Sequence, residues 1–293
     1  MIGFWIALWI WLSPLAHAAP CCSGTAVVPS LITSDASLQV STRISQSGVV
    51  GNSREDGSSV FNREGNDESV TRVAVDLSYA LDPRWQLHSG VPLNRRYRAI
   101  DARKSANWGI ADLSLGAAFE AIEELSYHQV FPRTWIFADL IVPAGRAPDQ
   151  SSDLLRSDVH GRGAWGGALG FFSQKSFKGF DAYLLGTHQR YLPQGSFSFG
   201  SVFLGDIGLG YNPGQFRFGV SIGPQWEGTD SDPNGLTSQR SKLVWTSGVS
   251  MGASFQDAWS LVGSYADQTL FGPTYNSQLS RTFMITAMHR INK

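Results

Sequence analysis

Short segments in which apolar and polar positions alternate recur from Ala36 to the end of this 293-residue chain. The segment 71–79 is representative: Val73, Val75, Leu77 and Tyr79 share one parity, and polar or small residues occupy the other. Neighbouring side chains of a strand point to opposite faces, so each segment predicts a strand with one apolar and one polar face.

The connections between these segments alternate between short and long. The predicted strands lie at 36–46, 69–81, 85–93, 108–120, 134–142, 163–173, 180–190, 201–211, 216–225, 242–255, 259–267 and 280–291. Tight turns rich in Pro, Gly, Asn and Asp, such as 81–84 and 212–215, alternate with long polar links at 47–68, 94–107, 143–162, 226–241 and 268–279. We therefore predict an all-β fold over 36–293: a closed, antiparallel transmembrane β-barrel of about twelve strands with up-and-down topology.

The N-terminus carries the features of a secretory signal. An apolar run from Phe4 to Leu12 is followed by Ala16-His17-Ala18, a small-x-small cleavage pattern. This predicts a signal peptide over 1–18; a retained anchor helix is the alternative, because no Lys or Arg precedes the run. Residues 19–35 have no strong period and are expected to form a periplasmic or plug segment.

A signal peptide followed by a barrel predicts a bacterial outer-membrane protein. Short turns of such barrels face the periplasm, so both termini are expected there. Ten aromatic residues near the short turns are predicted to form a girdle at that interface: Tyr79, Trp85, Phe119, Trp135, Phe171, Phe180, Tyr211, Phe216, Phe255 and Trp259. A soluble β-sandwich is the alternative, since half-buried sheets alternate in the same way.

Composition narrows the expected partners. Charged residues make up 16% of the chain and the formal net charge is −1, so no basic field indicates a nucleic-acid partner. The expected partners are outer-membrane lipid, the outer-membrane assembly machinery and a small-molecule solute.

Projecting the alternation places a set of charged side chains on the inner face. The predicted lumen-lining residues are Arg72, Asp76, Asp112, Glu120, Asp139, Asp206, Arg217 and Lys242. Two interpretations remain open: these charges line a polar permeation path, or they pair across the lumen and fill it.

Cys21 and Cys22 are the two cysteines and are adjacent. Pro20 precedes them, which disfavours a lipoprotein. In an oxidising envelope they could form a vicinal disulfide, pair between chains, or bind a soft metal weakly. No metal site is predicted, because two thiolates are an incomplete ligand set.

Catalytic signals are weak. An outer-membrane hydrolase would need a nucleophile, a His base and an orienting partner close in space. The candidates are His88 beside Ser89, His160 with Asp158, and His188. We predict no enzyme activity and no cofactor, since motifs for nucleotide or zinc binding are absent from the sequence.

Several motifs resemble those of one family of bacterial outer-membrane proteins. They are Cys21-Cys22-Ser23-Gly24, Leu77-Ser78-Tyr79-Ala80-Leu81, Gly109-Ile110-Ala111-Asp112-Leu113 and Ile141-Val142-Pro143-Ala144-Gly145-Arg146. The family is that of the MetA pathway of phenol degradation. The resemblance implies an outer-membrane channel for small hydrophobic or aromatic compounds, and we predict passive diffusion. The alternative is a non-conducting structural or adhesin-type barrel that acts through its extracellular loops.

Overall fold

The computed structural model describes residues 29–33, 36–62, 66–123, 131–194, 198–231, 240–255 and 258–292. The strands in this part of the chain are β1 (Leu38–Ser53), β2 (Ser59–Phe61), β3 (Asp67–Ala80), β4 (Trp85–Ile100), β5 (Arg103–Ile110), β6 (Leu113–Ile122), β7 (Arg133–Val142), β8 (Gly166–Phe177), β9 (Phe180–Tyr191), β10 (Val202–Tyr211), β11 (Phe216–Glu227), β12 (Lys242–Phe255), β13 (Trp259–Asp267) and β14 (Gln278–Ile291). A single-turn 3₁₀ helix, η1 (Pro148–Gln150), lies between β7 and β8. Within the described ranges, no helix is long and apolar enough to cross a membrane.

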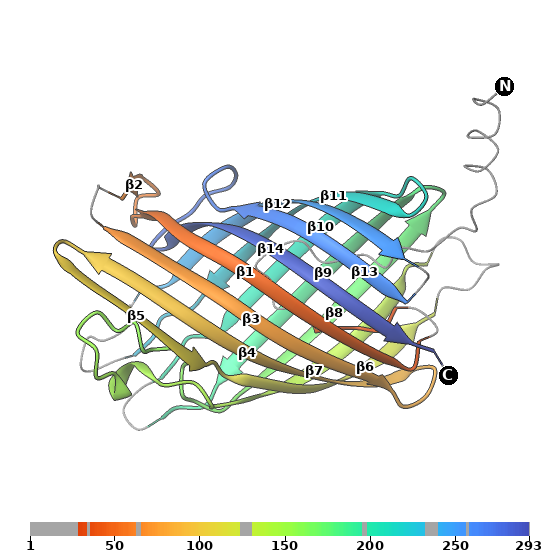
Figure 1. Cartoon of the computed structure of the whole chain (residues 1–293), viewed down its shortest axis with the longest axis horizontal. Coiled ribbons are helices and arrows are strands. Elements are labelled where there is room, and N and C mark those ends of the chain that lie inside the picture. Colours follow the sequence, from red (N-terminus) through yellow and green to blue (C-terminus); the bar gives the residue numbers. More distant parts are fainter. Residues whose placement is uncertain are drawn as a thin grey trace.

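Antiparallel pairing of strands that follow one another in the chain builds the wall, and pairing of β14 with β1 closes it (Figure 1). The result is the predicted closed antiparallel barrel of 12 strands, with β2 and β5 as additions. We call the end with the short connections the turn end and the opposite end the loop end. β1 begins and β14 finishes at the turn end, where the register pairs Leu38 with Ile291.

Residues 94–107 were predicted to form a long polar link without strands, and this prediction is wrong. β4 continues to Ile100 and forms a hairpin with β5. β5 pairs with the part of β4 toward the loop end, residues 93–100, and β6 pairs with the part toward the turn end, residues 85–90. β5 and β6 are therefore two halves of one wall strand, interrupted at Ala111 and Asp112. One extra residue stands opposite Pro92 at this point, a β-bulge that changes the direction of the neighbouring side chains.

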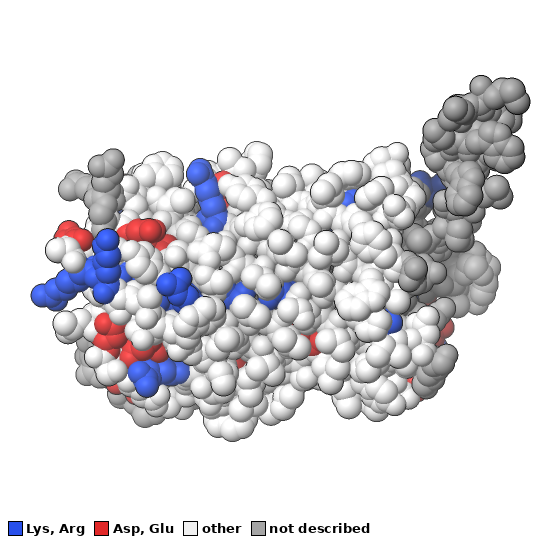
Figure 2. All heavy atoms as spheres, in the orientation of Figure 1, with Lys and Arg blue, Asp and Glu red and all other residues white. Residues whose placement is uncertain are grey.

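The exterior of the barrel is apolar. Val75, Leu77, Leu115, Ile207 and Leu209 are all exposed on it. In Figure 2 few charged residues lie across the middle of the face in view, and most gather toward the loop end. An apolar surface of this extent is stable in contact with lipid and costly in water.

The aromatic girdle is confirmed in part. Eight of the ten predicted residues are exposed at 39% or more: Tyr79, Trp85, Phe171, Phe180, Tyr211, Phe216, Phe255 and Trp259. Phe119 is half-buried against Trp85, with 4.9 Å between ring centroids. Trp135 was assigned wrongly, because it is fully buried inside the barrel.

An apolar core fills the lumen toward the turn end, and Trp135 belongs to it. Its members are Leu31, Ala118, Trp135, Phe137, Phe172, Tyr183 and Leu185. The rings of Trp135 and Tyr183 each lie 5.9 Å from that of Phe172. Close-packed aromatic side chains exclude water, so this core narrows the barrel from within.

The outward face gives the first testable prediction. Leu115, on β6, is 50% exposed on the exterior, whereas Leu154 is 84% exposed in the loop before β8. Leu115→Arg should destabilise the barrel in lipid by about 2–4 kcal/mol, because arginine on the lipid face is costly near the midplane. Leu154→Arg is the matched control and should fold like the wild type. The folded fraction in vesicles, measured by heat-modifiable gel mobility, checks this; equal folding of the two variants would contradict the assignment of faces.

Candidate functional site: a cavity in the lumen

The long connection between β7 and β8, residues 143–165, folds across the lumen at the loop end; we call it the crossing loop. Its Arg162 forms an ion pair with Glu227 on β11. The same guanidinium lies 4.5 Å from the ring centroid of Tyr191 on β9, within cation–π distance. The crossing loop therefore reaches the wall opposite β5.

Asp112 fastens the crossing loop to the near wall. Its carboxylate accepts a hydrogen bond from the backbone N–H of Gly145 at 3.1 Å and another from that of Arg162 at 2.8 Å. These two residues stand at the two ends of the loop, so one carboxylate at the bulge holds both. Hydrogen bonds to a charged acceptor are stronger than neutral ones.

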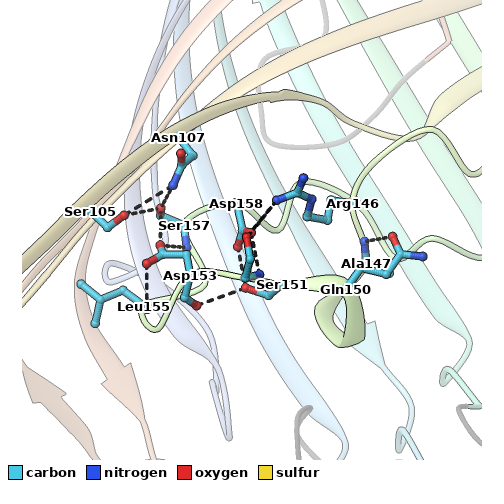
Figure 3. A network of polar contacts seen from close by, with 11 residues as sticks. Ser105, Asn107, Arg146, Ala147, Gln150, Ser151, Asp153, Leu155, Ser157 and Asp158 are labelled. Carbon is cyan, nitrogen blue, oxygen red and sulfur yellow. Dashed lines mark hydrogen bonds and ion pairs between the residues drawn. The ribbon is translucent and has the colours of Figure 1, made fainter.

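A second anchor joins the middle of the loop to β5 (Figure 3). The Ser157 hydroxyl lies 2.9 Å from that of Ser105 and 2.5 Å from the Asn107 amide nitrogen. Asp153 accepts hydrogen bonds from the hydroxyl of Ser157 at 2.6 Å and from its backbone N–H at 2.9 Å. On β4, Arg98 donates to the backbone carbonyl of Leu155 at 2.9 Å.

Asp158 organises the other side of the loop (Figure 3). Its carboxylate accepts from Arg146 at 2.7 Å, from the Ser151 hydroxyl at 2.5 Å and from the Ser152 backbone N–H at 2.9 Å. Burial by itself would raise the pKa of Asp158, but these hydrogen bonds outweigh it and hold the pKa well below its usual range. The hydrogen bond from Ser157 likewise lowers the pKa of Asp153.

Residues 29–33 approach the lumen from the turn end. The side-chain amide of Gln86 accepts from the Ile32 backbone N–H at 2.8 Å and donates to its carbonyl at 3.0 Å. Arg133 donates to the carbonyl of Thr33 at 2.7 Å, and Leu31 packs into the apolar core. This short stretch lies inside the barrel and narrows it below the crossing loop.

A cavity of about 610 Å³ lies between the two obstructions. Its lining includes Pro29 and Ser30 from one end and His160 and Arg162 from the other. The walls come chiefly from inward positions of β1, β3 and β4, with contributions from β6, β7, β8, β9, β13 and β14. This volume falls in the range of pockets that hold small organic ligands.

The eight predicted lumen residues fall into two groups. Arg72, Asp76, Asp112 and Asp139 line the cavity. The other four, Glu120, Asp206, Arg217 and Lys242, lie outside it and are bonded to inward neighbours.

The partners of the predicted charges are close. Arg43 binds Asp76 with two nitrogens at 2.8 and 3.0 Å, and His88 Nε2 lies 2.5 Å from Asp139. Outside the cavity, the closest atoms of each pair are separated by 2.6 Å in Arg133–Glu120, 2.7 Å in Arg217–Asp181, 2.6 Å in Tyr183–Asp206 and 3.3 Å in Lys242–Glu227. Most of these charges are therefore paired, and their partners lie on the adjacent or next-but-one strand of the wall, not across the lumen.

Several cavity residues were not among the predicted ones. Arg43 has inward parity within a predicted strand, so the alternation itself could have identified it. Arg96 was missed because β4 was predicted to end at residue 93. His160 was placed in an external loop, and no signal in the sequence indicates that this loop folds inward.

The geometry gives little support to the alternative that the protein is an outer-membrane hydrolase. His88 has an acidic partner, but Ser89 shares the parity of the exposed residues Leu87 and Val91. His188 stacks on Phe203, with 4.3 Å between ring centroids. Among the described residues no cluster of three or more His, Cys, Asp or Glu could hold a metal; Cys21 and Cys22 lie outside those residues.

Comparison with known proteins shows the fold. No family model matches the chain, and no curated protein matches it. An outer membrane channel from Pseudomonas putida F1 has a similar structure, with a TM-score of 0.71 and 13% sequence identity over 91% of this chain and 98% of that one. The NanC porin has a TM-score of 0.50 at 9% identity, over 86% of this chain and 100% of that one. The beta domain of the Bordetella autotransporter BrkA has the same score at 12% identity, over 88% and 100%. The chain therefore has an outer-membrane β-barrel fold; the narrower resemblance to the MetA-pathway family stays a prediction.

The anchoring role of Asp112 can be tested by proteolysis. Asp112→Asn removes the charge and replaces one of the two acceptor oxygens with an NH2 donor, so one of the two hydrogen bonds is lost, at a cost of about 1.5–3 kcal/mol. Trypsin should then cleave after Arg156 at least about 10-fold faster, since 1.4 kcal/mol corresponds to a factor of ten. Asp149→Asn, an exposed carboxylate of the same loop, is the matched control. Equal cleavage rates in both variants would contradict the anchor.

The same loop gives a prediction about pH. Asp153 and Asp158 have lowered pKa values, so their contribution to loop stability is complete above the ordinary carboxyl pKa of 3.8. It is lost as pH falls through the lowered values. Amide exchange at Ser152 and Ser157 should therefore stay protected, after correction for intrinsic rates, from pH 7 to about pH 4.5. Loss of protection between pH 7 and pH 5 would contradict this assignment.

Proposed function

We propose that this protein is an outer-membrane channel that lets small solutes pass by passive diffusion, hydrophobic or aromatic compounds among them. The observation that carries the proposal is the cavity inside the lumen, bounded by the crossing loop at one end and residues 29–33 at the other. A channel needs internal space that reaches toward both openings, whereas a structural anchor has no use for such space.

Polar contacts that water can replace hold much of both obstructions. The crossing loop is held by side-chain and backbone hydrogen bonds. Residues 29–33 are held by hydrogen bonds with Gln86, Arg133, Ser78 and Gln39 and by burial of Leu31 and Ile32. Such segments can open locally without unfolding the strand ladder, because their free energies of opening lie below that of the whole fold.

The proposed solute class rests on two supports. The sequence motifs resemble those of a family linked to phenol degradation, which implies aromatic compounds. The cavity lining mixes apolar side chains, such as Val70, Ile141 and Met284, with charged ones. Such a surface suits a small solute that has an apolar body.

The proposed setting is the bacterial outer membrane, with the turn end in the periplasm. Short turns face the periplasm in known barrels of this type, so both termini would lie there. Outer-membrane lipid and the assembly machinery are the expected partners.

Conductance across a planar bilayer tests the channel. The wild type should form pores, and Gln86→Ala should increase the mean conductance because it removes two hydrogen bonds to Ile32, each worth about 0.5–1.5 kcal/mol. Gln215→Ala, which removes an exposed glutamine in the turn between β10 and β11, is the matched control and should conduct like the wild type. If the wild type forms no pore and cells that lack the protein take up solutes normally, the channel proposal is refuted. The adhesin-type or structural barrel is then the better explanation.

A further inference from the structure

The cavity wall formed by β1, β3 and β4 carries more arginines than carboxylates. Four arginines occupy inward positions on these strands: Arg43, Arg72, Arg96 and Arg98. The inward-facing carboxylates on the same strands are Glu68 and Asp76. Four positive and two negative charges leave a formal surplus of two positive charges on these strands. Over the whole cavity lining, Arg162 adds one positive charge, Asp112 and Asp139 add two negative charges, and Arg98 and Glu68 are not part of the lining, so four arginines face three aspartates.

The two carboxylates are already engaged. Asp76 binds Arg43 through two hydrogen bonds. Glu68 Oε1 lies 2.8 Å from Arg98 Nη2 but 4.0 Å from Arg96 Nε. Arg98 is therefore the principal partner of Glu68, and Arg96 is compensated only weakly.

Arg72 is the other source of surplus charge. Its Nε donates a hydrogen bond to the side-chain oxygen of Asn94 at 3.0 Å, and it makes no ion pair with any described residue. This bond orients the guanidinium on the cavity wall and leaves its terminal nitrogens available. Arg72 and Arg96 both line the cavity, so this weakly compensated charge faces it.

His160 of the crossing loop adds further hydrogen-bonding capacity at the same place. It packs on Gly109, where a side chain would collide with its ring, and Gly109 pairs with Asn94 in the row that contains Arg72. Both ring nitrogens of His160 are buried and have no hydrogen-bond partner in the described part of the chain. Burial and the nearby Arg96 lower the pKa of His160, so the ring is neutral at pH 7 and keeps one donor.

The rest of the cavity lining is mixed, with polar groups from Ser45, Ser47, Ser114, Thr187 and Gln189 beside apolar side chains. Val70, Ala74, Ala111, Ile141, Val159 and Met284 contribute to it. A ligand that fits this space would have an anionic group that contacts the arginines and an uncharged part that contacts the remaining wall.

We propose that the cavity is a binding site for a small organic monocarboxylate with an apolar body. The carboxylate would lie between Arg72 and Arg96, with the Asn94 amide and His160 as further donors. Guanidinium groups recognise carboxylates through paired N–H···O bonds, which accounts for the choice of anion. This inference rests on the proposed function, since it names a class of solute that pauses in the channel.

Titration calorimetry on the full-length protein in detergent tests the site, with benzoate as the anionic probe and benzyl alcohol as its neutral counterpart. Combined Arg72→Gln and Arg96→Gln should weaken benzoate binding at least about 10-fold, because each arginine supplies charge-assisted hydrogen bonds. Benzyl alcohol should bind the double variant and the wild type alike. Arg84→Gln, which removes an exposed arginine paired with Glu123 at the turn end, is the matched control and should leave benzoate binding unchanged.

A second variant keeps the test informative if the double variant folds poorly. Ser45 is the cross-strand neighbour of Arg72 and also lines the cavity. Ser45→Glu should place a carboxylate beside Arg72, neutralise it and weaken benzoate binding without removing any arginine.

Two results would overturn the proposal: wild type that does not bind benzoate, or benzoate binding that is equal in the wild type and in Ser45→Glu. Bilayer conductance of the same preparation tests the proposed channel function independently of benzoate binding. A conducting barrel without a benzoate site would refute the carboxylate inference alone, and a barrel that binds benzoate but does not conduct would refute the proposed function alone.

Discussion

Closure of the sheet by β1 and β14 is the constraint on which the rest of the structure depends. Lipid offers no hydrogen bonds to the backbone, so a sheet inside a membrane can have no unpaired edge. The β1–β14 ladder runs from Leu38–Ile291 to Asn52–Gln278, along nearly the whole of both strands. Once it forms, the parity of each strand is fixed, and every apolar side chain on one parity faces outward.

Closure also creates an interior that must be filled. A barrel of 12 strands encloses more space than its wall side chains need, and this chain fills the two ends differently. Aromatic packing around Trp135, Phe137 and Phe172 occupies the turn end together with Leu31. Polar networks of the crossing loop occupy the loop end, and the cavity is the volume that neither fills.

Burial explains why the lumen is rich in ion pairs. A charged group enclosed by the wall loses hydration, and a close partner with good geometry offsets much of that loss. Arg217 with Asp181 and Arg133 with Glu120 meet this condition through paired contacts at 2.6–2.9 Å. Against this background Arg72 and Arg96 have the weakest carboxylate partners among the cavity arginines, which is the basis for placing the proposed anion between them.

The sequence by itself determined the barrel, since the two-residue period and the alternating connection lengths follow from strand geometry and membrane physics. It also placed Asp76, Asp112 and Asp139 on the inner face, because parity within a strand requires no knowledge of tertiary contacts. Parity alone could not separate Trp135 from the exposed girdle, because an aromatic residue suits both lipid and a packed lumen. Only the tertiary structure decided that the crossing loop folds inward, since its anchors at Asp112, Ser105 and Glu227 come from strands distant in the chain. The charge balance of the cavity was decided there too, because it depends on which arginine lies within hydrogen-bonding distance of which carboxylate.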